Sequence, residues 1–142
     1  MDEQLDPELG SVLAVGLRDA DRAAASRACT VADSARSAIE LLRMLRFDLV
    51  VTADQLPDMP VWQFVNRMRT AWPWQKWALV SSRLTEFDEI TARTLGVMQI
   101  IEGAVDWDAV GHLATMLHEQ SESRRLLVRA DSQLLRPATS TG

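Results

Sequence analysis

Few of the reactive side chains in this sequence stand at spacings that would bring them together. His112 and His118 are six residues apart, whereas side chains that share one face of a helix are three or four apart. Ser81 and Ser82 end an apolar run with no histidine near them in the order of elements, which argues against a hydrolase triad. Cys29 is the only cysteine, so the sequence excludes an intramolecular disulfide and a cysteine-based zinc site.

Asp54 and Gln55 follow another apolar run, at a place where open α/β sheets commonly form their sites. The sequence has no GxGxxG and no GxxxxGK[ST] loop to hold a nucleotide phosphate. This absence counts against a flavodoxin-like module that binds a nucleotide or a flavin. That alternative stays open, and the absorbance spectrum of the purified protein tests it.

These residues are positioned by short apolar runs that alternate with helix-patterned segments. The runs are nearly continuous, as is typical of strands buried on both faces of a parallel sheet. The expected strands are Ser11–Gly16, Ala28–Ala32, Phe47–Ala53, Lys76–Ser81 and Val97–Ile101. The expected helices are Asp19–Arg27, Ala35–Arg46, Pro60–Pro73, Thr85–Leu95 and a last one from Asp106 to at least His118. This alternation predicts an α/β fold with one parallel sheet.

The composition is that of one globular domain of 142 residues, 47% hydrophobic and 25% charged. A net charge of −5 disfavours binding of the whole domain to nucleic acid or to a membrane surface. No run approaches the roughly 18 apolar residues of a membrane span, and the first ten residues are acidic where a signal peptide would be basic. We therefore expect a cytoplasmic protein.

Several motifs, taken in order, resemble the receiver domain of bacterial two-component response regulators over residues 11–121. They are Phe47-Asp48-Leu49-Val50-Val51, Leu56-Pro57-Asp58-Met59-Pro60, a strand ending in Ser81-Ser82, and Thr94-Leu95-Gly96. The resemblance implies a flavodoxin-like (βα)5 fold with a five-stranded parallel sheet of order 2-1-3-4-5. It also implies a pocket in which an aspartate accepts a phosphoryl group from a histidine kinase, assisted by Mg²⁺, a hydroxyl and a lysine.

Carried over residue by residue, the resemblance keeps only the hydroxyl of that pocket, at Ser81. The acidic pair that holds Mg²⁺ falls on Gly16 and Leu17, neither of which can ligate a cation. The lysine position falls on Gly103, and the only lysine of the chain, Lys76, precedes the fourth expected strand. We therefore expect a degenerate pocket that binds no Mg²⁺ and needs no cofactor.

The acceptor position, counted back from Leu56-Pro57, falls on Ala53 and leaves Asp54 one residue late. Because a one-residue shift redirects a strand side chain, we expect Asp54 to be a loop-capping aspartate beside Gln55. The alternative is that a loop shortened by one residue brings Asp54 onto the acceptor site. The chain would then be an atypical response regulator phosphorylated at Asp54.

With the pocket degenerate, function must lie on a surface. Tryptophan is a leading anchor residue at protein interfaces. Trp72 and Trp74 flank Pro73 and serve either local packing or a partner contact. Trp62 begins the third expected helix beside the pocket, where we hypothesise that it fills the space of metal and phosphate.

The last helix changes character at Ser121–Arg124 and then resumes a helix-forming composition, with apolar residues at Leu126, Leu127, Val128 and Leu134. A helix this apolar on one side is not stable alone in water. It therefore folds back on its own domain or docks on another chain, and we favour docking on a partner protein or on a second copy.

The sequence thus predicts a lead at residues 1–10, a receiver-like domain at 11–121, a helical extension at 122–136 and a disordered tail at 137–142. The predicted function is that of a pseudo-receiver in bacterial phosphorelay-type signal transduction. It would be no enzyme, and it would act by phosphorylation-independent protein–protein interaction.

Overall fold

The computed structural model describes the backbone of residues 11–26 and 29–135, and within them the side chains of all but residues 19–20 and 128–135. The expected lead at residues 1–10, residue 136 and the expected tail at 137–142 lie outside the described residues.

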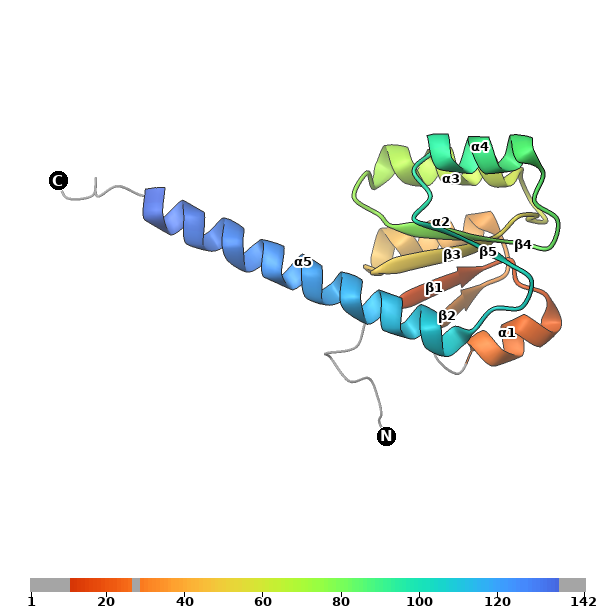
Figure 1. Cartoon of the computed structure of the whole chain (residues 1–142), viewed down its shortest axis with the longest axis horizontal. Coiled ribbons are helices and arrows are strands. Elements are labelled where there is room, and N and C mark those ends of the chain that lie inside the picture. The colour runs from red at the N-terminus through yellow and green to blue at the C-terminus, as the bar shows by residue number, and fades with distance from the viewer. Residues whose placement is uncertain (1–10, 27–28, 136–142) are drawn as a thin grey trace.

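The strands of the described chain form one parallel sheet in the order β2-β1-β3-β4-β5 (Figure 1). Its register places Val12 opposite Leu49 and Ala53 opposite Val80. The expected sheet and strand order are confirmed. The strands are β1 (Val12–Val15), β2 (Thr30–Ala32), β3 (Leu49–Ala53), β4 (Trp77–Ser81) and β5 (Gln99–Glu102).

A helix follows each strand, as the alternating pattern predicts. The Ser34 hydroxyl accepts a hydrogen bond from the backbone N–H of Ser37 and so begins the second helix as an N-cap. This helix ends at Met44, two residues before the expected end, because Leu45 has an extended backbone. The helices are α1 (Asp19–Ala25), α2 (Ala35–Met44), α3 (Val61–Ala71), α4 (Glu86–Thr94) and α5 (Trp107–Leu135).

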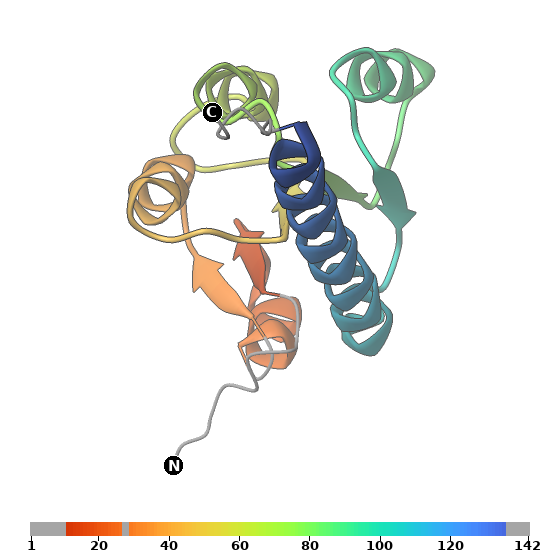
Figure 2. The same ribbon diagram turned by 90° about the vertical axis from the view of Figure 1, so that its left-hand side faces the viewer.

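The sheet is covered on both faces (Figure 2). Helices α2, α3 and α4 pack on one face, in a core that includes Phe64 and Trp77, and α1 and α5 cover the other, with Leu49 and Val110. Successive residues of the central strands therefore enter opposite cores. This two-sided burial explains why the strands read as nearly continuous apolar runs.

Helix α5 continues well beyond the sheet (Figure 1). Val110, Ala114 and Leu117 are buried against the domain, whereas every side chain from Glu119 to Leu127 is exposed. The change of character at residues 121–124 does not interrupt the helix. We call residues 119–135 the α5 stem. In the part of the chain that the structure describes, no helix has both the length and the apolar character to cross a membrane.

Candidate functional site

The candidate site lies at the edge of the sheet where the parallel strands end. The turn after β1 begins with Gly16, β3 ends at Ala53 next to Asp54, and β4 ends at Ser81. Gly103, after β5, donates its backbone N–H to the Ser81 carbonyl oxygen at 3.3 Å. The fold thus gathers these sequence-predicted residues at one edge.

A leucine lies where the resemblance implies a metal-binding carboxylate. Gly16 has a φ of +71°, a conformation that side-chain-bearing residues rarely adopt. A Cβ atom built there would overlap the Cδ2 atom of Leu56 and would lie 3.6 Å from both the Ala53 Cβ and the Gln55 carbonyl oxygen. Leu56 itself is partly buried and packs against the core on the α2–α3 face. An aspartate at this position would meet both backbone strain and a filled space.

The second position of the implied acidic pair is also apolar. Leu17 is partly buried and packs against the core that α1 and α5 cover. Mg²⁺ binds through carboxylate, carbonyl and water oxygens. The side chains at Gly16 and Leu17 therefore do not fit that ion.

Asp54 and Ser81 form the polar contact of the site. The Ser81 hydroxyl donates a hydrogen bond to the Asp54 Oδ2 atom at 2.8 Å, and Ser81 is only 2% exposed. The expected loop-capping contact of Asp54 is not among the hydrogen bonds of the described residues. The turn that follows Ala53 instead brings the Asp54 carboxylate beside the end of β4.

The cationic partner of the implied pocket is missing. Gly103 is exposed, has a φ of +83°, and has no atom of another element within 4 Å of the position of a Cβ. Lys76 is exposed and lies before β4, at the other end of that strand. A phosphoryl group bonded to Asp54 would therefore meet no ammonium group.

Metal and thiol chemistry find no support elsewhere among the described side chains. No group of three or more histidine, cysteine, aspartate or glutamate residues in this part of the chain could hold a metal ion. Burial raises the pKa of the Cys29 thiol to about 11, so this group is protonated near neutral pH.

Trp62 and Asp54 line the same hollow, an open space of about 530 Å³ along the loop between β3 and α3. The indole of Trp62 is half-buried and packs against the core on the α2–α3 face. The side chain that lies against Gly16 is Leu56 rather than Trp62. Sequence reasoning missed this role of Leu56, because an apolar residue in a loop motif does not indicate what it covers.

Asp58, in the same loop, is a second residue that sequence reasoning missed. Its carboxylate oxygens accept hydrogen bonds from the backbone N–H groups of Ala35 and Arg36, each at 2.9 Å, and so cap the first turn of α2. Slight desolvation raises the pKa of Asp58, but the N–H groups of Arg36 and Ala35 together lower it below its ordinary value. The loop over the candidate site is thereby attached to α2.

The predicted partner-binding residues differ in exposure. Trp72 is half-buried and packs against the core, whereas Trp74 is 59% exposed and lies under the Arg46 guanidinium, 5.7 Å from its ring centre. Leu126 and Leu127 on the α5 stem are 62% and 65% exposed. Val128 and Leu134 belong to the helix, but their side chains lie outside those described.

A polar contact at the opposite edge of the sheet ties α5 to the domain. Asp48 accepts the backbone N–H of Ser11 at 2.8 Å, and its carboxylate lies 3.3 Å from Nδ1 of His118. Asp48 directly precedes β3, and Ser11 directly precedes β1. One carboxylate therefore connects the starts of two strands with helix α5. The six-residue spacing of the histidines gives no sign of this contact.

No protein-family model and no curated protein matches the sequence. Solved structures do match the fold. A CheY-like response regulator receiver domain protein from Methanospirillum hungatei is 18% identical, with a TM-score of 0.69, over 81% of this chain and 98% of that chain.

Two further structures agree with it. The signal receiver domain of an HD domain-containing protein from Pseudomonas fluorescens is 18% identical over 79% of this chain and 98% of that one, with a TM-score of 0.68. A response regulator receiver protein from Pseudomonas putida is 19% identical over 78% and 96%, with a TM-score of 0.64. The chain therefore has the flavodoxin-like receiver fold that its motifs imply, followed by the α5 stem.

Proposed function

We propose that this chain is a pseudo-receiver: a receiver-fold domain that takes part in two-component signal transduction without transferring a phosphoryl group. It acts in the bacterial cytoplasm by docking to a protein partner or to a second copy. It is not an enzyme and binds no Mg²⁺. The receiver fold of its structural neighbours supports the signalling role.

The contact between Leu56 and Gly16 is the observation that carries this proposal. A working acceptor pocket needs oxygen ligands at the end of β1 to hold the cation that neutralises an incoming phosphoryl group. Here the residue is glycine, its left-handed backbone disfavours any side chain, and the Leu56 side chain occupies the space of a Cβ atom. Since the lysine position is Gly103, a transferred phosphoryl group would also lack the ammonium group of the implied pocket.

Docking would use surfaces that need no phosphorylation to form. Trp74 and the stem residues Leu126 and Leu127 are large apolar side chains that are more than half exposed. Tryptophan is a frequent anchor residue at protein interfaces, and exposed apolar side chains that lie together mark interaction surfaces. With Trp62 and Trp72, they are the side chains to which we assign partner binding.

The second candidate function is that of an atypical response regulator phosphorylated at Asp54. The hydrogen bond between the Ser81 hydroxyl and the Asp54 carboxylate favours it, since it pairs a possible acceptor with the hydroxyl of the implied pocket. Against it stand the apolar residues at Gly16 and Leu17, which supply no ligand for a cation.

Intact-mass measurement after incubation with acetyl phosphate and MgCl₂ separates the two functions. The pseudo-receiver keeps its mass. A phosphoryl adduct that is absent from the Asp54→Ala variant would establish the second candidate. The Asp58→Ala variant serves as a control, because it removes another carboxylate of the same loop.

A further inference from the structure

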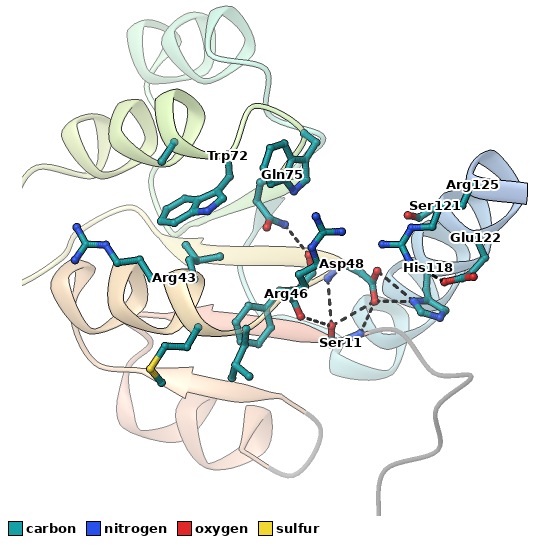
Figure 3. Close-up of a pocket in the computed structure, with 16 residues that line it drawn as sticks. Ser11, Arg43, Arg46, Asp48, Trp72, Gln75, His118, Ser121, Glu122 and Arg125 are labelled. Carbon is teal, nitrogen blue, oxygen red and sulfur yellow. Dashed lines mark hydrogen bonds and ion pairs between the residues drawn. The ribbon is translucent and has the colours of Figure 1, made fainter. Parts of the chain in front are cut away.

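The face formed by the C-terminal halves of α2 and α3 carries a groove away from the candidate site. One hollow, of about 590 Å³, lies between the two helices. A second, of about 570 Å³, is lined by the ends of these helices and by α5 (Figure 3). The hollows share Arg43, Ala71 and Trp72 in their walls. We call this joined space the arginine groove.

The arginine groove is cationic on an otherwise acidic chain. Arg43 and Arg67 line the upper hollow with no acidic residue, and Arg46 lines the lower one. Within the described part of the chain, no carboxylate forms an ion pair with any of these three guanidinium groups. Three arginines without a carboxylate partner therefore line the groove, and one of them, Arg46, lies over the Trp74 ring.

The two carboxylates of the lower hollow are already occupied. Asp48 binds the backbone N–H of Ser11 and His118, and Glu122 pairs with Arg125 at 3.4 Å, as Figure 3 shows. Both carboxylates keep their charge, but they lie at the α5 end of the lower hollow, and Arg43 lies at its other end (Figure 3). The part of the groove that is free of carboxylates is therefore the upper hollow, lined by Arg43 and Arg67.

The arginine groove also has exposed apolar side chains in its walls. Trp74 is 59% exposed, and Met44 and Leu45 at the end of α2 are 73% and 50% exposed; all three line the lower hollow. Trp72 adds a half-buried indole where the two hollows meet. An occupant that suits these walls has carboxylates for the guanidinium groups and apolar side chains for the rim.

We propose that the arginine groove binds an extended acidic segment of a partner protein, in which carboxylates alternate with leucine or aromatic residues. The proposal rests on the proposed function, because it names one docking surface of the pseudo-receiver. Two joined hollows exceed the size of a small anion and suit an extended chain. The exposed aliphatic side chains of Met44 and Leu45 at the rim favour an occupant with apolar side chains over a nucleic acid.

Fluorescence anisotropy tests the proposal with the full chain and a fluorescein-labelled peptide of alternating glutamate and leucine residues with one tryptophan. We expect saturable binding at low ionic strength that weakens as salt is added, since exposed charges are screened. A peptide with glutamine in place of glutamate should not bind. Equal binding of this amide peptide would overturn the proposal, as would no binding of the acidic one.

Arginine variants locate the site. Arg43→Gln and Arg67→Gln should each weaken peptide binding by about fivefold, the effect of losing one partly exposed charged contact. Arg69→Gln is the matched control, because Arg69 is exposed on α3 and lines neither hollow, and it should leave the affinity unchanged. Circular dichroism verifies that each variant is folded. Unchanged affinity in the Arg43→Gln and Arg67→Gln variants contradicts the assignment.

The experiment must also test whether the chain's own first residues occupy the arginine groove. Residues 1–10 contain four carboxylates and precede Ser11, which lines the lower hollow. If the peptide binds only after these carboxylates are changed to amides, the groove belongs to this chain's own segment and the proposal is wrong. A phosphoryl adduct at Asp54 would instead refute the proposed function, and it is read by mass rather than by peptide binding.

Discussion

Leu56 lies against the backbone of Gly16, at the end of the first strand. Two features thus disfavour a carboxylate side chain there: the left-handed φ of +71° and the overlap of a Cβ atom with the Leu56 side chain, which would have to move. The contact is apolar and internal to the domain. The Leu56 side chain thus fills the part of the edge where the motif resemblance implies a cation.

Alanine substitutions separate these two features. Gly16→Ala should lower the free energy of unfolding by more than about 2 kcal/mol, because it adds overlap to backbone strain. Gly103→Ala should cost only about 1–2 kcal/mol, since its φ is similar but no atom lies near its Cβ position. Urea unfolding measures both.

The Leu56→Ala background completes that comparison. Without the leucine, the cost of Gly16→Ala should fall to that of Gly103→Ala, a coupling of at least about 0.5 kcal/mol between the two positions. If the two substitutions are additive, Leu56 does not fill the space that we assign to it.

Asp58 should make stability depend on acid pH. Its pKa is lower in the folded state than its ordinary value, because the N–H groups of Ala35 and Arg36 bind the charged form. Its contribution is therefore complete above the unfolded-state pKa of about 3.9 and is lost as the pH falls through the lower folded-state value.

The Asp58→Ala variant checks this contribution. At neutral pH it should be about 1 kcal/mol less stable in urea unfolding, the usual effect of removing a helix cap. The difference from the native chain should shrink as the pH falls below about 4. Glu40→Gln, at an exposed position of α2 with no hydrogen bond to its side chain, should show neither effect. A difference that does not change with pH would refute the cap.

His118 and Asp48 should be energetically coupled. Each of His118→Ala and Asp48→Ala removes the contact that fixes α5 to the start of the sheet, and a partly buried hydrogen bond of this kind contributes about 1 kcal/mol. The double variant should then cost less than the two single losses together. His112→Ala, on the exposed side of the same helix, should stay within about 0.5 kcal/mol of the native chain. Additive losses at His118 and Asp48 would contradict the contact.

Leu126 and Leu127 should matter for association and not for folding. Because both are exposed on the α5 stem, Leu126→Gln with Leu127→Gln should change the unfolding free energy by less than about 0.5 kcal/mol. Sedimentation velocity, alone and with a partner, should show weaker association. Leu117→Gln, at a buried position of the same helix, should instead lower stability by about 2 kcal/mol or more. A large loss of stability in a monomeric stem variant would mean that the stem packs on its own domain.

The fold could be predicted from local patterns in the sequence, whereas the candidate site could be predicted only in part. The apolar runs around Leu49 and Leu79 and the helix stripe of Val61, Phe64 and Val65 required no long-range information, because burial on both faces of a sheet leaves a direct trace in residue type. The positions of Gly16 and Gly103 also followed from motif spacing.

The side-chain contacts at the candidate site could not be predicted from the sequence. Asp54 lies one residue late in the motif, yet its carboxylate meets Ser81, because the course of a short turn is not fixed by residue type. Leu56 and Asp58 act on residues about 40 and 22 positions away, Gly16 and Arg36, and single-sequence patterns carry no information about such pairs. The contact between His118 and Asp48 is another long-range pair of this kind.

The most direct test of the central claim is an NMR titration of the folded chain with MgCl₂ and then beryllofluoride, a mimic of the acyl phosphate. The amide signals of Gly16, Asp54, Ser81 and Gly103 report on the edge where the strands end. We predict no saturable shift of these four signals with either reagent, since the edge has no acidic side chain at Gly16 or Leu17 and no ammonium group at Gly103. Saturable shifts centred on Asp54 that vanish in the Asp54→Ala variant would contradict the account.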